Sequence, residues 1–368
     1  MRTSKGNRLM SSAVTASLTR HLVGVTRRRR ALGAPQVLVR SPLLPGDFRF
    51  GDQVTPFHAA SIGKMPTAVL VMQLVEEGAL TLDTRIAVIL PPEVLADLFV
   101  VHDVDHAGDV TVRQLLDHTS GIADYFEGIV TSGSGFLDLV LSDRDHLWLP
   151  HELLDFSRTR QRAVGSPGEM FHYSDTGYVL AGLIVEAMTA VPFHQSLHDR
   201  IFTPLHMADS YLMYRSVPTG AAPTGAAPAI APLWLDGVEA STFRSISCDW
   251  AGGGIVSTLD DLLRFSVGLH HGALLSASSL AELTTIRHRF RSGIHYGSGM
   301  MEIRFQEFFF LLRGLARPIG HIGVLGTHLF RDATHDAHIV MNFHSTAEMT
   351  RSFRTLIEIE RGLTRLAR

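Results

Sequence analysis

Two residues near the start of an apolar segment have the types and spacing of a nucleophile and its base. The segment reads HAASIGKMPTAVL from residue 58 to residue 70, and it contains Ser61 and Lys64. Residues three apart share one face of a helix, so the lysine nitrogen can reach the serine hydroxyl. A serine hydroxyl is a weak nucleophile that needs such a base. The spacing therefore indicates nucleophilic catalysis by Ser61.

The use of lysine at position 64 is informative in itself. The chain has 33 Lys and Arg residues, and only Lys5 and Lys64 are lysines. Arginine stays protonated in proteins, whereas a desolvated lysine can lose its proton and act as a base. A serine three residues before one of two lysines arises by chance about one time in seven, given ordinary serine usage. The pair alone therefore suggests a site without establishing one.

Longer segments extend the pattern and together resemble the β-lactamase-related serine hydrolases of the penicillin-binding-protein-like superfamily. S-x-x-K at the start of a buried helix is the first motif of that group. The resemblance covers nearly the whole chain after residue 35. The group it points to includes class C β-lactamases, D,D-carboxypeptidases, D-aminopeptidases and family VIII-type esterases. The similar segments, in chain order, are FRFGDQVTPFHAASIGK, VTVRQLLDHTSGIADY, SPGEMFHYSDTGYVLAGLIVE, IFTPLHMADSYL, AGGGIVSTLDDLLRF and GHIGVLG.

The resemblance implies catalytic roles for four residues. Ser61 would be the acylated nucleophile, and Lys64 would take or share its proton. Tyr173, in the second motif, would act as a base in acylation and as an acid toward the leaving group. His321, in the third motif, would polarise the substrate or hydrogen-bond Tyr173.

The same resemblance implies residues that bind the substrate. The backbone amides of Ser61 and Val324 would form the oxyanion hole. Gly323 would let the substrate approach the strand closely. Tyr125 would either line an acyl pocket or pack as a core aromatic residue.

The second motif departs from the family pattern at Asp175, where asparagine is commonest. An asparagine offers an amide donor to the substrate, while an ionised aspartate offers only acceptors. Two roles are open for Asp175: it binds the substrate from this position through its acceptors, or it pairs instead with Lys64 and keeps that lysine charged, which would weaken it as a base. This difference favours ester hydrolysis over β-lactam hydrolysis. The chain contains only two asparagines, Asn7 and Asn342, so a compositional bias is the alternative explanation.

The elements that position these residues indicate an α/β (α+β) fold. Strand patterns at both ends of the chain predict an antiparallel sheet flanked by helices, with an inserted, mostly helical subdomain. The sheet part is expected at about 35–80 and 250–368, and the helical insertion at about 81–249, all within one catalytic domain of residues 35–368. Helices are predicted at 61–78, 111–121, 174–190 and 346–366, and a loop at the Pro- and Gly-rich repeat 218–232.

Residues 1–34 are expected to be a basic, disordered leader, because they contain no acid and include a run of four arginines. A start site placed too far upstream is equally compatible. A transit-like peptide and an arm for nucleic acid or a membrane surface are further alternatives. No continuous apolar stretch resembles a secretory signal, so a cytoplasmic location is predicted, with organellar targeting left open.

Composition restricts the function classes. The net charge of −3 and pI near 6.7 give no overall attraction to nucleic acid or anionic membranes. A single cysteine excludes an intramolecular disulfide framework. No apolar run approaches the roughly 20 residues that a membrane-spanning helix needs. No metal or cofactor is predicted, and the oligomeric state stays open.

The predicted function is a serine hydrolase that acts on a small ester or amide substrate through an acyl-enzyme at Ser61. An esterase is the first choice, a D-amino-acid peptidase, amidase or D,D-carboxypeptidase the second, and a β-lactamase the third. Acyl transfer to an acceptor other than water would use the same residues. The alternative from another class is a non-catalytic relative that binds cell-wall fragments or serves as a scaffold.

Overall fold

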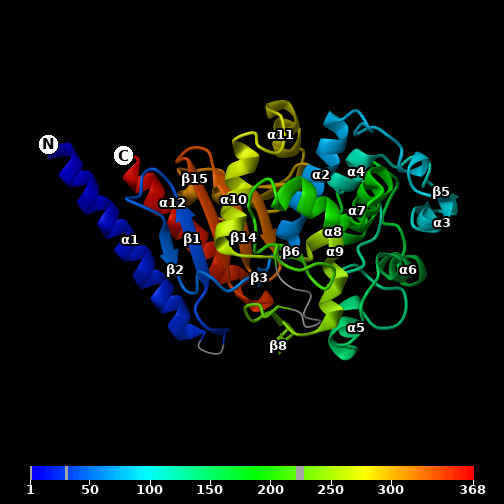
Figure 1. Ribbon diagram of the computed structural model, residues 1–368, viewed down its shortest axis with the longest axis horizontal. Helices are drawn as coiled ribbons and strands as arrows, with labels where there is room; N and C mark the ends of the chain where they lie inside the picture. Colours follow the sequence, from blue (N-terminus) through cyan, green and yellow to red (C-terminus); the bar gives the residue numbers. More distant parts are fainter. Residues whose placement is uncertain (1, 30–31, 221–227) are drawn as a thin grey trace.

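An antiparallel sheet of eight strands, contributed by both ends of the chain, forms the centre of the structure. The computed structural model describes residues 2–29, 32–220 and 228–368. The strand order is β10-β11-β12-β13-β14-β15-β1-β2, so the first strands lie beside the last one (Figure 1). The strands are β1 (Gln36–Arg40), β2 (Phe48–Phe50), β10 (His288–Arg291), β11 (Ile294–Tyr296), β12 (Met301–Ile303), β13 (Ile319–Gly323), β14 (Thr327–Asp332) and β15 (Ala337–Asn342).

Side chains alternate between the two faces of the sheet along each strand. Apolar residues occur on both faces, and helices cover both of them. Val37 and Val39 point to the face that also buries residues of α1 (Arg2–Arg28) and α12 (Met349–Leu366). Leu38 points to the opposite face, which is covered by α2 (Lys64–Glu76) and α10 (Leu259–His270). The α2 helix is buried on nearly all sides, so its sequence is apolar throughout.

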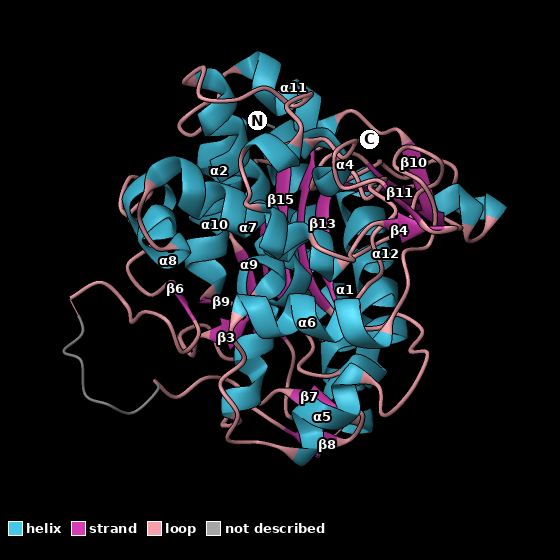
Figure 2. Ribbon diagram, turned by 90° about the vertical axis from the view of Figure 1, so that its right-hand side faces the viewer, coloured by secondary structure: helices cyan, strands magenta, loops and turns pink. Residues whose placement is uncertain are grey.

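The remaining helices lie mainly between α2 and α10 in sequence and form the second part of the structure (Figure 2). Three small sheets accompany them: β3-β9-β6, β4-β5 and β7-β8. Their strands are β3 (Phe57–His58), β4 (Val100–Val101), β5 (Val104–Asp105), β6 (Tyr211–Leu212), β7 (Trp234–Leu235), β8 (Val238–Glu239) and β9 (Ile255–Ser257). The helices are α3 (Pro92–Leu95), α4 (Val112–Leu116), α5 (Phe136–Ser142), α6 (Pro150–Arg160), α7 (Asp175–Thr189), α8 (Phe193–Leu197), α9 (Trp250–Gly253) and α11 (Ala277–Thr284).

The predicted fold class is confirmed, and most predicted helices are present. The helix predicted at 111–121 is wrong beyond Leu116. From Asp117 the chain is a loop, with His118 at a φ of 60°. The His118 carbonyl accepts from the amide of His172 at 2.8 Å, so pairing with a distant segment replaces the helical bonds. The predicted Pro- and Gly-rich loop falls largely on residues 221–227, outside the described residues.

Within the described ranges, no single helix is long and apolar enough to cross a membrane. The helical segments Asp175–Thr189 and Phe193–Phe202 would reach that length only together, and they are bent by 81°. Nine of the 15 residues of the first segment are buried inside the protein.

The prediction of a disordered leader is wrong for residues 2–28, which form helix α1 along one side of the molecule next to α12 (Figure 1). Apolar residues recur at helical spacing and are buried there: Val14, Leu18, Leu22 and Val25. This periodicity is the usual signal of an amphipathic helix, and it decides the structure of the segment although residues 1–34 contain no acid. Arg29 is also buried and forms an ion pair with Glu348 at 3.6 Å, directly before α12.

We expect Leu22→Ala to lower the free energy of unfolding by about 2–5 kcal/mol, because Leu22 of α1 is fully buried in the core cluster that also contains residues of β1 and α12. Thermal and urea unfolding of the full chain would measure the change. Thr19→Ala, at an exposed position of the same helix, is the matched control. Equal stability of the two variants would show that α1 does not contribute to the core.

Candidate active site

Ser61 lies in a tight turn that leads directly into α2. Residues Ala60–Gly63 form a 3-10 turn, and Lys64 is the first residue of the helix. Ala60 has a φ of 50°, a conformation that costs energy for a residue with a Cβ and that often marks functional sites. The predicted helix from residue 61 is thus present. Its first turn places Lys64 Nζ 3.3 Å from Ser61 Oγ.

Lys64 is fully buried beneath the nucleophile, and three acceptors surround its nitrogen. Nζ donates to the Gly252 carbonyl at 2.8 Å and to Ser61 Oγ, and it forms a short ion pair with the Asp175 carboxylate. An ammonium has three donors, so this arrangement satisfies the charged form completely. Burial lowers the pKa of Lys64, but its polar partners, the Asp175 carboxylate first among them, hold that pKa above its ordinary value. Of the two roles open for Asp175, the pairing with Lys64 is present, and Asp175 also lines the cavity.

Tyr173 and Asp175 are positioned by the start of helix α7. The Ser174 side chain caps this helix by accepting from the Gly177 amide, which fixes the residues on either side of it. Tyr173 lines the cavity above Ser61, and its ring stacks on Phe290 at 5.1 Å. Burial raises the pKa of Tyr173, although Lys64 and Ser61 act against this rise. The resting tyrosine is therefore neutral and can donate a proton.

His321 does not hydrogen-bond Tyr173, and it does not line the cavity. Its Nδ1 lies 2.8 Å from the Ile322 carbonyl, and its Nε2 lies 3.2 Å from the Tyr296 hydroxyl. A carbonyl only accepts, so Nδ1 carries the proton and Nε2 accepts from Tyr296. Burial and the charge of Lys64 lower the pKa of His321 to about 3, which keeps it neutral. The expected contact with Tyr173 is corrected to one with Tyr296.

Gly323 is required by the approach of strand β13 to the Ser61 turn. A Cβ on Gly323 would lie 2.7 Å from the Ala60 Cβ and 2.1 Å from Thr327 Oγ1. Thr327 Oγ1 also donates to the Ala59 carbonyl at 2.9 Å, which ties the next strand to the same turn. Ser61 and Val324 consequently line one cavity. The oxyanion hole from their amides remains a prediction.

The cavity beside Ser61 has a volume of about 150 Å³ and is lined by apolar residues, by acidic residues and by one arginine, Arg291. Its apolar lining residues include Phe290, Ile294, Met301, Ile322 and Phe353. Its acidic lining residues are Asp124, Glu127, Asp175 and Asp249. Burial and the nearby Asp175 raise the pKa values of Asp124 and Asp249 to about 7.

The assignment of Tyr125 to the substrate site is wrong. Its side chain is buried, packs edge-on against Phe136 at 4.8 Å, and donates to the Cys248 carbonyl at 2.8 Å. The neighbouring residue Asp124 lines the cavity instead. Successive residues in extended segments point in opposite directions, and the sequence does not reveal which of the two points inward. Asp249 was missed because no motif marks it.

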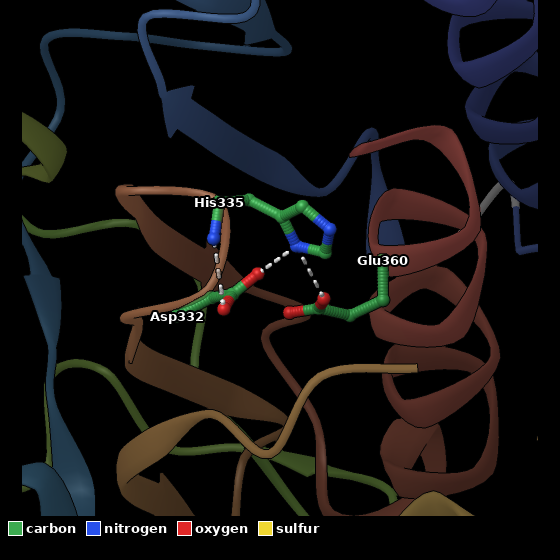
Figure 3. Close-up of side chains that lie close together, drawn as sticks. All are labelled: Asp332, His335 and Glu360. Atoms are coloured by element: carbon green, nitrogen blue, oxygen red, sulfur yellow. Dashed lines mark hydrogen bonds and ion pairs between the residues drawn. The ribbon is translucent and has the colours of Figure 1, made fainter. Parts of the chain in front are cut away.

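Asp332, His335 and Glu360 form a buried polar cluster away from the cavity (Figure 3). Among the described residues this is the one group of three with side-chain types that bind metals, and its donor atoms lie within 4.8 Å of one another. His335 pairs closely with Asp332 and lies 3.8 Å from Glu360. These contacts join the turn after β14 to helix α12, so the cluster links the sheet to its covering helix.

Stability is expected to fall with rising pH because of Glu360. Burial and the nearby Asp332 raise the pKa of Glu360 well above its ordinary value. Above the ordinary carboxyl range the unfolded chain loses this proton while the folded chain keeps it, which costs up to about 1.4 kcal/mol per pH unit until the raised pKa is reached. Glu360→Gln mimics the protonated form and should flatten the decline of Tm as the pH rises above the ordinary carboxyl range. Glu358→Gln on the same helix is the control, and an equal slope in all three proteins would contradict the assignment.

Comparison with known proteins gives consistent matches. The sequence model of the family described as Beta-lactamase matches residues 52–360. Penicillin-binding protein 4 of Amycolatopsis lactamdurans is 35% identical over 187 residues, which cover 48% of this chain and 43% of that protein. The chain spans only 43%, 37% and 51% of three curated relatives that it matches, about half their length or less.

Solved structures match over almost the whole chain. The D-amino acid amidase of Ochrobactrum anthropi SV3, complexed with D-phenylalanine, has a TM-score of 0.73 at 23% identity and covers 94% of this chain and 99% of its own. EstCE1, described as a hydrolase with promiscuous acyltransferase activity, has a TM-score of 0.71 at 17% identity. The match covers 95% of this chain and 99% of EstCE1. At such identities the likeness shows the fold.

Proposed function

Because the chain belongs to the Beta-lactamase family, we propose that it is a serine hydrolase that works through an acyl-enzyme on Ser61. The observation that carries the proposal is the convergence of three groups at one cavity: Ser61 Oγ, the buried amine of Lys64 at 3.3 Å, and the neutral phenol of Tyr173. A scaffold or binding protein has no need for a nucleophile placed over a buried lysine.

The proposed reaction uses these groups in order. Ser61 Oγ attacks the carbonyl carbon, and its proton passes to Lys64 in the fraction of molecules in which that amine is neutral. The Tyr173 hydroxyl protonates the leaving oxygen and is reprotonated by Lys64. The amides of Ser61 and Val324 stabilise the oxyanion. Water then attacks the acyl-enzyme by the same steps, which releases the acid and restores Ser61.

An ester is the preferred substrate class. The charged state of Lys64 makes it a weak base, and an ester needs less help than an amide because its leaving group is better. Asp175 provides no amide donor for the acyl chain of a β-lactam. The apolar walls formed by Phe290, Ile294 and Ile322 fit an apolar acyl group.

A second candidate function is hydrolysis of amides that carry a cationic amine, as D-amino acid amides do. The observation that favours it is the acidic lining of the cavity, where Asp124 and Asp249 face the same space as Ser61. The pKa values of Asp124 and Asp249 are raised to about 7, and a bound substrate ammonium would favour their ionised forms, which attract it directly. The structural similarity to a D-amino acid amidase is compatible with this candidate.

A substrate panel tests both candidates. We would measure kcat/KM for p-nitrophenyl butyrate, the p-nitroanilide of D-phenylalanine and nitrocefin under the same conditions. The highest value is expected for the ester. A higher value for the anilide, reduced selectively by Asp249→Asn, would replace the first candidate with the second. Lack of turnover of all three by folded protein would contradict both and favour the non-catalytic alternative.

A further inference from the structure

Four consecutive apolar side chains are exposed between strands β12 and β13. We call residues 308–311 the apolar loop: Phe308, Phe309, Phe310 and Leu311 have exposed fractions of 41, 51, 64 and 65%. Single exposed apolar residues are ordinary, but a contiguous group usually marks a surface that contacts another molecule. Two 3-10 turns, Phe305–Glu307 and Phe310–Leu312, give this segment a defined shape.

Arginines surround the apolar loop. A groove beside it is lined by Leu311, Leu312, Gly314, Leu315, Arg361, Thr364, Arg365 and Arg368, with no acidic side chain among them. Arg313 and Arg317, in the same connection as the loop, are exposed as well. Within the described ranges only one of these five arginines has an ion pair, that of Arg361 with Glu358 at 2.8 Å. The patch is therefore cationic although the whole chain carries a net charge of −3.

The loop is connected to the wall of the active-site cavity. The Phe308 ring packs edge-on against Phe353 at 5.5 Å, and Phe353 lines the cavity that contains Ser61. The more exposed Phe310 and Leu311 do not line that cavity. The outer part of the loop is thus available for contacts that leave the catalytic groups in place.

We propose that the apolar loop and its arginines dock onto the surface of an anionic lipid membrane. Aromatic and leucine side chains insert at the boundary between headgroups and acyl chains, and arginines beside them attract anionic headgroups. A second copy of the chain fits less well, because a symmetric dimer through this patch would place the same arginines opposite each other. The proposal does not depend on the chemistry at Ser61.

Vesicle co-sedimentation of the full chain tests the proposal. Wild type should bind vesicles of phosphatidylcholine mixed with phosphatidylglycerol, bind weakly to phosphatidylcholine alone, and dissociate as salt rises. The double variant Phe310→Ser/Leu311→Ser should bind at least about tenfold more weakly. Arg365→Gln and Arg368→Gln should each weaken binding by about fivefold.

A matched control removes two other exposed apolar side chains. Val54→Ser/Val88→Ser changes residues that are 78 and 77% exposed outside the patch, and it should bind like wild type. Thermal unfolding and hydrolysis of a water-soluble ester should be unchanged in all variants, which separates lost docking from lost folding. Absence of wild-type binding at low salt, or equal binding by the loop variant, would overturn the proposal. Self-association that depends on the loop, without vesicle binding, would assign the patch to a second copy instead.

Discussion

Lys64→Arg is expected to reduce kcat/KM for an ester by about a thousandfold, the range of a lost general base. Arginine keeps the positive charge that pairs with Asp175, so position 64 still offers Asp175 a cation. It does not release a proton, however, and therefore does not accept the one from Ser61. Steady-state hydrolysis of p-nitrophenyl butyrate would measure the loss. A loss of less than about tenfold would show that Lys64 contributes charge only.

Two controls keep this result interpretable. Lys5→Arg makes the same exchange at the only other lysine of the chain and should leave the rate unchanged. Arginine is larger than lysine and position 64 is fully buried, so Tm must be measured as well. Lys64→Met has nearly the volume of lysine without its charge. It should show a similar loss of rate if folding is retained.

Asp175→Asn is expected to raise kcat/KM at neutral pH by at least about tenfold. It should also shift the acid limb of the pH–rate profile to lower pH. Asp175 is the strongest of the groups that hold the pKa of Lys64 up, and burial acts in the opposite direction. Without the carboxylate, burial dominates and the pKa of the lysine falls. Each unit of that fall gives about ten times more neutral amine at a fixed pH below the pKa.

The control for this prediction is Asp249→Asn. Asp249 lines the same cavity but makes no ion pair with Lys64, so its replacement should leave the acid limb nearly in place. A decrease in rate for Asp175→Asn, with no movement of the acid limb, would contradict the account. Asp175 would then serve as a proton acceptor in the reaction and not as a restraint on the lysine.

Local chemistry made the centre of the site predictable from the sequence. Helical spacing alone placed Ser61 and Lys64 on one face, and the structure joins them at 3.3 Å. The charge of Asp175 predicted its partner, because an ionised carboxylate beside a buried amine has no better contact. The sheet to which both ends of the chain contribute strands was predictable from the strand patterns near the two termini.

Features that depend on tertiary packing were not predictable in the same way. The partner of His321 is set by the sheet, which brings Tyr296 of β11 near β13 across the intervening strand β12. The inward direction of Asp124 rather than Tyr125 depends on how a loop turns after α4. Helix α1, in contrast, was predictable from the sequence, because its apolar residues recur at helical spacing. Its basic, acid-free composition indicated disorder instead, and that indication was wrong.

The most direct test of the central claim is the intact mass of the protein after exposure to a fluorophosphonate probe. The account predicts a single adduct per wild-type chain and none on Ser61→Ala, because only an activated serine reacts with this electrophile. Peptide mapping should place the adduct on Ser61. The absence of an adduct on folded wild type, or an equal adduct on Ser61→Ala, would contradict the assignment of Ser61 as the nucleophile.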